Sequence, residues 1–112
     1  LTSQGWWTGG FGGSVAYAAS KGGIVSMSRG LARTLAPYEI TVNTVAPGFV
    51  DTPMLVTGVP QEQLEEWKRM VPLGKRFTTP EEVAGPIVFL ASDHASHITS
   101  TTINVTGGQL VY

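Results

Sequence analysis

The chain has 112 residues, 42% hydrophobic and 13% charged, with a formal net charge of -1 at pH 7. This length allows one domain at most, and the balanced charge excludes the basic surface that holds a nucleic-acid backbone. No apolar run is long enough to span a bilayer, and no signal-peptide pattern opens the sequence. The absence of cysteine excludes disulfides and thiolate sites, which fits a reducing cytoplasm.

The first third of the chain predicts a strand end, a loop and a long helix. Leu1 to Ser3 is typical of the end of a strand, and residues 4–13 form a Gly-rich loop that carries three aromatic residues. Ser14 is a candidate N-cap for a helix that runs to about Ala36, before Pro37 stops it.

Two faces of this helix can be distinguished from spacing. Large apolar residues recur at three and four residues, as expected for a face buried against a core: Ile24, Met27, Leu31 and Leu35. Small residues recur at every fourth position, and they would allow another backbone to approach closely: Gly22, Ser26 and Gly30.

The rest of the chain alternates strands and helices. Residues 40–45 are β-branched and predict a strand, residues 60–70 a short amphipathic helix, and residues 101–105 a final strand. A capping box of Thr79 and Glu82 predicts a helix that continues to about Ser92. This order of apolar strands and crossover helices predicts an α/β fold with a parallel sheet.

Tyr17 and Lys21 lie four residues apart on the first helix and therefore share a face. A neighbouring ammonium favours the phenolate form of a tyrosine, which suits the phenol to proton transfer. Taken alone, the pair is more often a structural tyrosine beside a lysine that extends to solvent.

In its wider context the chain resembles the short-chain dehydrogenase/reductase family across nearly its whole length. The resemblance rests on several motifs in order: Ser3 before the Gly-rich loop, Tyr17-x-x-x-Lys21, residues 42–48, Asp51-Thr52-Pro53, residues 80–84, residues 89–93, and residues 103–105 before Gly107-Gly108. It implies the last three strands and helices of a doubly wound parallel Rossmann-type sheet. Residues 1–112 would then be the C-terminal catalytic half of one such domain, with the N-terminal dinucleotide-binding half absent.

The resemblance also implies an activity, which is hydride transfer between NAD or NADP and a ketone or secondary alcohol. Tyr17 would be the general acid or base, Lys21 would assist it and bind the nicotinamide ribose, and Ser3 would hold the substrate oxygen.

Further roles follow from the same resemblance. Four residues would contact the cofactor beside Tyr17 and Lys21: Pro47, Gly48, Val50 and Thr52. Residues 53–70 would form a lid over the substrate, with Met54, Leu55 and Trp67 facing it. The family implies a homodimer or homotetramer and a small carbonyl or alcohol substrate, without a metal.

Several departures from the family pattern leave alternatives open. Ser3 precedes Tyr17 by 14 residues, one more than the family pattern leads us to expect, and Ser14 is a competing hydroxyl. Tyr38-Glu39 stands just after the helix, where relatives often have glycine, so that turn should be strained or reshaped. The glycines at 9–13 lack the spacing of a phosphate loop. A truncated, inactive remnant that acts only as a folding or assembly partner is the alternative function.

Overall fold

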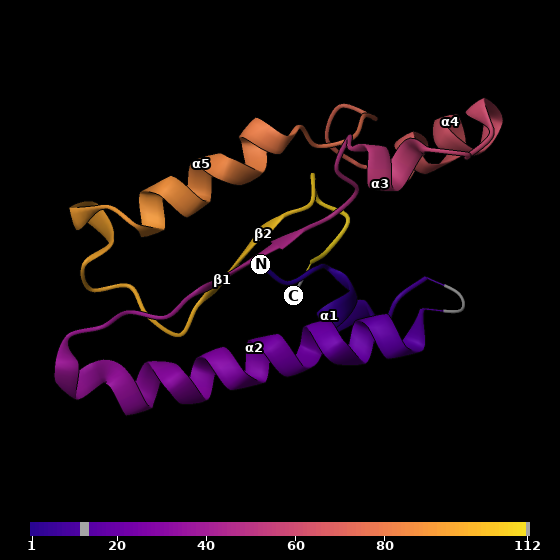
Figure 1. Cartoon of the computed structure of the whole chain (residues 1–112). Coiled ribbons are helices and arrows are strands. Elements are labelled where there is room, and N and C mark those ends of the chain that lie inside the picture. The colour runs from indigo at the N-terminus through magenta and orange to yellow at the C-terminus, as the bar shows by residue number, and fades with distance from the viewer. Residues whose placement is uncertain (12–13, 112) are drawn as a thin grey trace.

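The computed structural model describes residues 1–11 and 14–111, in which helices precede and separate two strands (Figure 1). They are the helices α1 (Gly5–Thr8), α2 (Val15–Leu35), α3 (Pro53–Val56), α4 (Gln61–Arg69) and α5 (Pro80–Leu90), the strands β1 (Thr44–Pro47) and β2 (Thr102–Val105), and the 3-10 turns Ala36–Tyr38 and Asp93–Ala95. The predicted α/β class is therefore confirmed.

The sheet is parallel, and its register pairs Thr44 with Thr102 through Pro47 with Val105. The segment before α1 lies along the opposite edge of β1, where the N–H of Thr2 donates to the Val45 carbonyl at 2.9 Å and the N–H of Gln4 to the Pro47 carbonyl at 2.9 Å. These two bonds have the spacing of a parallel ladder. The predicted strand end at residues 1–3 thus pairs with β1 through these bonds, although the segment is not assigned as a strand.

The strand predicted at residues 40–45 begins later, at Thr44, and this prediction was wrong at its N-terminal end. Residues 42 and 43 bond instead to the turn before β2, through the Asn43 amide to the Ile98 carbonyl at 2.9 Å and the Thr101 N–H to Asn43 Oδ1 at 3.1 Å. The Asn43 side chain therefore bonds to backbone groups that would otherwise pair with the backbone of β1, and the strand begins one residue later, at Thr44.

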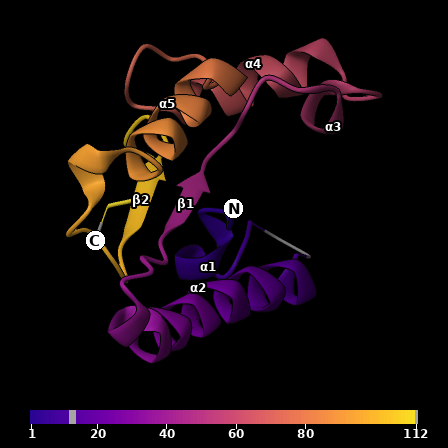
Figure 2. The ribbon, with the colours of Figure 1, turned by 60° about the vertical axis from the view of Figure 1, so that its left-hand side comes forward.

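The helices α2 and α5 lie on opposite sides of the sheet, and α5 contacts both strands (Figures 1 and 2). The carboxyl ends of the strands point toward the end of the molecule that carries α3 and α4 (Figure 1). Ligands of open α/β sheets bind outside the carboxyl ends of the strands. This arrangement therefore leaves room for a site between α2, α5 and the α3–α4 segment.

The buried face of α2 differs from the predicted one. Its buried residues are Ala18, Val25, Ser28 and Ala32, whereas Met27 is 59% and Leu31 41% exposed. The buried set has helical spacing too, but it is made mostly of small side chains, which let the helix lie close to its neighbours. Side-chain size therefore misled the assignment of the core face.

Glu39 ends the turn after α2 in a left-handed conformation, with φ +60°. This conformation favours glycine because a Cβ atom crowds the following carbonyl oxygen. The predicted strain at this turn is confirmed.

The start of α5 carries the predicted capping box. The Glu82 N–H donates to Thr79 Oγ1 at 3.2 Å, and the Thr79 N–H donates to Glu82 Oε2 at 2.8 Å. Arg76 adds two charged bonds to the same carboxylate, at 2.9 and 2.6 Å. These bonds, with the Arg76 guanidinium as the largest cause, lower the pKa of Glu82 from 4.5 to about 2.

We predict that this carboxylate makes stability pH-dependent in acid. Because the pKa of Glu82 is about 2 in the folded protein and ordinarily 4.5, its stabilisation is present above pH 4.5 and is lost as the pH falls toward 2. Glu82→Gln should lower the urea midpoint at pH 7 and flatten its fall between these pH values. Glu81→Gln removes a charge from the adjacent position and serves as the control. Equal behaviour of the two variants would contradict the role of the Arg76–Glu82 pair.

Candidate active site

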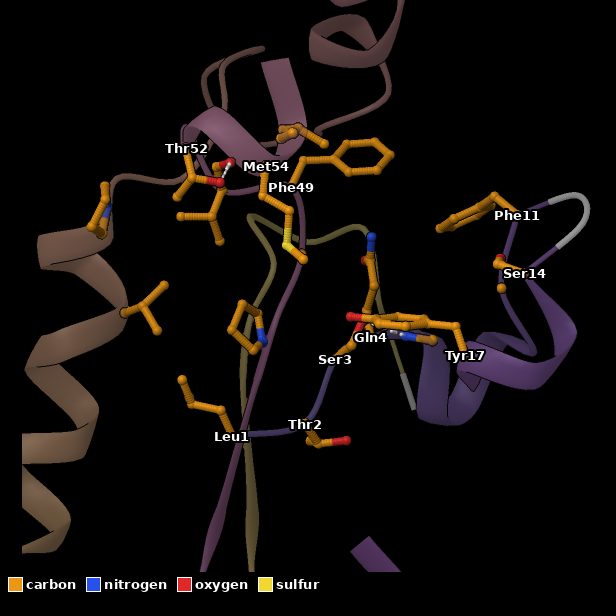
Figure 3. Close-up of a pocket in the computed structure, with 18 of the residues that line it drawn as sticks. Leu1, Thr2, Ser3, Gln4, Phe11, Ser14, Tyr17, Phe49, Thr52 and Met54 are labelled. Carbon is orange, nitrogen blue, oxygen red and sulfur yellow. Dashed lines mark hydrogen bonds between the residues drawn. The ribbon is translucent and has the colours of Figure 1, made fainter. Parts of the chain in front are cut away.

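A cavity of about 820 Å³ opens at the carboxyl end of β1 (Figure 3). Its wall is built from residues 1–5, the start of α2, residues 47–50, the α3–α4 segment and one side of α5. Most of this wall is apolar, and the polar side chains on it are few: Thr2, Ser3, Gln4, Ser14, Tyr17 and Thr52. A mostly apolar cavity with a few convergent polar groups is the usual form of a small-molecule site.

Ser3 and Tyr17 approach each other across Gly5. A Cβ atom placed on Gly5 would lie 3.6 Å from Ser3 Oγ and 3.7 Å from Tyr17 Cε1, so both groups border the same small space. Ser3 Oγ also accepts a bond from the Gly5 N–H at 3.2 Å. In Figure 3 the Tyr17 ring extends from α2 toward Ser3. The structure therefore places the Ser3 hydroxyl and the Tyr17 ring at the same part of the cavity wall.

Ser14, the competing hydroxyl, also lines the cavity but lies elsewhere on its wall. Figure 3 shows Ser14 beside Phe11, toward the Cβ atom of Tyr17 and not toward the end of its ring. The extra residue in the loop does not prevent Ser3 from reaching Tyr17, because Gly5 allows the strand end and α2 to come close. The geometry thus favours Ser3 over Ser14.

Lys21 lies beside the phenol, with Nζ 5.5 Å from the centroid of the Tyr17 ring. This is the arrangement expected for positions one helical turn apart. Lys21 is half-buried and does not belong to the wall that the described residues form around the cavity. Its ammonium therefore lies beside the Tyr17 ring and outside that wall.

All four residues predicted to contact a cofactor lie on the cavity wall: Pro47, Gly48, Val50 and Thr52. Val50 forms a parallel bridge with Thr78, in which the Thr78 N–H donates to the Phe49 carbonyl and the Asp51 N–H to the Thr78 carbonyl, each at 2.9 Å. These bonds use the Phe49 carbonyl and the Asp51 N–H, so neither of them involves the Val50 N–H. Thr52 Oγ1 donates to the Val50 carbonyl at 3.4 Å.

Gly48 has a structural reason to be glycine that the sequence did not reveal. A Cβ atom there would lie 3.0 Å from Gln109 Oε1 and 3.1 Å from Thr106 Cα. The second contact is with backbone and cannot be relieved by a rotamer change. Crowding from the segment after β2 therefore favours glycine at this position, whatever the cavity holds.

Two features of the wall were missed from the sequence. The first is Gln4, which is 4% exposed and whose Oε1 has no hydrogen-bond partner among the described residues. Its Nε2 donates a long bond of 3.4 Å to Gln109 Oε1. Phe49 is the centre of an aromatic cluster, with ring centroids 6.2 Å from Phe11, 5.7 Å from Trp67 and 6.1 Å from Phe77. The position of Phe49 directly after Pro47-Gly48 was the one available signal.

The α3–α4 segment occupies the place predicted for a lid. Met54, Leu55 and Trp67 all line the cavity, and Met54 is 95% exposed.

Within residues 1–11 and 14–111, no group of three or more His, Cys, Asp or Glu residues is placed to hold a metal ion. No helix in the same ranges is long and apolar enough to cross a membrane.

Comparison with known proteins assigns the family. A family model described as enoyl-(acyl carrier protein) reductase matches residues 2–109. The chain belongs to the short-chain dehydrogenase/reductase family. A solved structure described as a short-chain dehydrogenase/reductase, glucose/ribitol dehydrogenase, from Brucella melitensis superimposes with a TM-score of 0.89 at 39% identity, over 100% of this chain and 44% of that one.

Curated relatives are similar over most of the chain. A 3-oxoacyl-(acyl-carrier-protein) reductase FabG from Aquifex aeolicus is 45% identical over 97 residues, which is 86% of this chain and 38% of the relative. The corresponding reductase MabA from Mycobacterium bovis is 43% identical over 99 residues, 88% of this chain and 39% of the relative. The chain thus spans about two fifths of the length of these relatives.

Proposed function

We propose that this chain carries the acid–base residues of an NAD(P)-dependent oxidoreductase that interconverts a ketone and a secondary alcohol. One observation carries the proposal: Ser3 Oγ and the Tyr17 ring border the same cavity on either side of Gly5, with Lys21 Nζ 5.5 Å from the ring. Family membership supports it, because the resemblance on which these residues were selected implies this chemistry.

Each polar residue has a distinct proposed role. Tyr17 donates a proton to the substrate oxygen during reduction and removes it during oxidation. Ser3 donates a hydrogen bond to the same oxygen and stabilises the charge that develops there. Lys21 favours the phenolate of Tyr17 through its positive charge.

The wall residues fit a nicotinamide dinucleotide. The Val50 N–H, which the Thr78 bridge leaves out, is a donor suited to a carboxamide or phosphate oxygen. The Thr52 hydroxyl, whose hydrogen is donated to the Val50 carbonyl, can accept a bond from the carboxamide N–H. Lys21 offers further donors for a ribose hydroxyl. When bound, the dinucleotide, NAD or NADP, supplies or accepts the hydride. Pro47 and Gly48 would form the flat wall beside its ring.

The substrate proposed for this cavity is a ketone that carries an aliphatic chain. The wall opposite Ser3 and Tyr17 is apolar and includes Phe49, Met54, Leu55 and Trp67. Burial of methylene groups there contributes about 0.8 kcal/mol for each one. The names of the relatives, which specify 3-oxoacyl substrates, support the same class.

Tyr17→Phe tests the proposed acid. It removes the transferable proton but keeps the ring, so turnover should fall by about 10³-fold or more while the thermal midpoint stays close to wild type. Tyr38→Phe, at a tyrosine that is 72% exposed and outside the cavity wall, is the matched control and should be fully active. Near-normal turnover of Tyr17→Phe would disprove the assignment.

Lys21→Met tests the electrostatic role at nearly constant side-chain length. Without the ammonium the phenolate is less favoured, so the pH at which alcohol oxidation is half-maximal should rise. Lys75→Met, which removes an exposed lysine elsewhere, should leave the pH–rate profile unchanged. An unshifted profile in Lys21→Met would separate this lysine from the proton transfer.

We further propose that copies of the protein assemble as a homodimer or homotetramer. Ser26, Met27, Gly30 and Leu31 form an exposed surface on α2 that could contact another copy, and the family resemblance implies such assembly. Multi-angle light scattering at micromolar concentration should give two or four times the chain mass. A single-chain mass would contradict assembly.

A further inference from the structure

Thr2 forms a hydrogen bond that ties the strand end to α2. Its hydroxyl donates to the Lys21 carbonyl at 2.8 Å, across 19 residues of sequence. Thr2 is 5% exposed, and its own N–H donates to the Val45 carbonyl of β1 at 2.9 Å. One buried residue therefore connects β1, the segment that carries Ser3, and the helical turn that carries Lys21.

This bond is not needed to form α2. In an α-helix the carbonyl of residue 21 already accepts the N–H four residues further on, and a carbonyl oxygen has two lone pairs. The Thr2 hydroxyl therefore uses the second lone pair. What the bond adds is a directional constraint, because it fixes how far α2 slides and rotates relative to the strand end.

The contact of Gly5, at the start of α1, with α2 is less directional. Gly5 and Ala18 meet through small apolar surfaces, with the Ala18 Cα atom 3.8 Å from a Cβ placed on Gly5. Apolar packing depends on buried area and not on direction. It would tolerate a shift of a fraction of an ångström that a hydrogen bond resists.

The two proposed catalytic hydroxyls lie on the two parts that Thr2 joins. Ser3 is held between two peptide groups bonded to β1, those of Thr2 and Gln4. Tyr17 lies one helical turn before Lys21 on α2. The separation of the Ser3 and Tyr17 hydroxyls therefore depends on the placement of α2 against residues 2–4.

We infer that Thr2 is a positioning residue of this site: its hydroxyl, through the Lys21 carbonyl, sets the placement of Tyr17 and Lys21 relative to Ser3. The inference rests on the proposed function and adds to it a residue of the cavity wall whose hydroxyl bonds to the Lys21 carbonyl of α2 and is not assigned to substrate or cofactor. A misplacement of about 1 Å between catalytic groups can reduce a rate by about 10²-fold, so the effect on turnover should be large compared with that on folding.

Thr2→Val and Thr2→Ser test the inference on the protein assayed with its dinucleotide. Valine keeps the shape but removes the hydroxyl, so kcat should fall about tenfold or more while KM and the dinucleotide dissociation constant change by less than about twofold. Serine keeps the hydroxyl and should restore kcat to within about twofold of wild type. Thr2→Ala gives the same comparison if the valine variant does not fold.

Thr44→Val is the matched control for the loss of a buried threonine hydroxyl. Thr44 is 4% exposed, and its Oγ1 bonds to β2 and the residue before it, at 2.8 Å from Thr102 Oγ1 and 3.4 Å from the Thr101 carbonyl. Its removal should lower the thermal midpoint by an amount similar to that for Thr2→Val while kcat, measured per folded protein, stays at the wild-type value.

Three results would overturn the inference: normal kcat in Thr2→Val, no recovery in Thr2→Ser, or an equal loss of kcat in Thr44→Val. These differ from a failure of the proposed function. If Tyr17→Phe is inactive and Thr2→Val is normal, Thr2 alone is misassigned. If Tyr17→Phe is fully active, the proposed function itself is wrong.

Discussion

The pairing of residues 2–4 with β1 is the constraint on which the candidate site depends. Two backbone bonds of 2.9 Å hold this segment against the strand on both sides of Ser3. Backbone bonds to a parallel ladder fix both the position and the direction of a side chain. Because β1 ends at Pro47, the same ladder also fixes the distance from Ser3 to the turn at Gly48 and to the cavity wall beyond it. Ser3 is therefore fixed against β1 where chemistry is proposed.

The rest of the cavity is built from less constrained elements. The aromatic cluster around Phe49 joins the turn after β1 to Trp67 of α4, and it holds the α3–α4 segment over the opening. Exposed apolar residues such as Met54 are typical of a segment that contacts a ligand or closes on one. Ser3 is held by backbone bonds to β1, whereas the α3–α4 segment lines the cavity with exposed apolar side chains such as Met54. This difference agrees with the proposed reaction, in which the carbonyl group keeps one position while the attached chain varies.

Sequence reasoning succeeded where local chemistry decides the structure. The capping box of Thr79 and Glu82 and the strain at Glu39 depend on residues a few positions apart, and both were predicted. It failed where tertiary packing decides: α2 buries Ala18, Ser28 and Ala32 in place of Met27 and Leu31, because close approach mattered more than side-chain size. The crowding of Gly48 by Gln109 and the Thr2–Lys21 bond join residues far apart in sequence, and no local pattern indicates them.

In the proposed reaction the Ser3 and Tyr17 hydroxyls act on one substrate oxygen. A crystal structure of the protein with its dinucleotide and an unreactive ketone analogue tests this most directly. If both hydroxyls contact that oxygen, Tyr17 Oη and Ser3 Oγ should each lie within about 3.2 Å of the ketone oxygen. Contact of that oxygen with Ser14 in place of Ser3, or a Tyr17 hydroxyl directed away from it, would contradict the account.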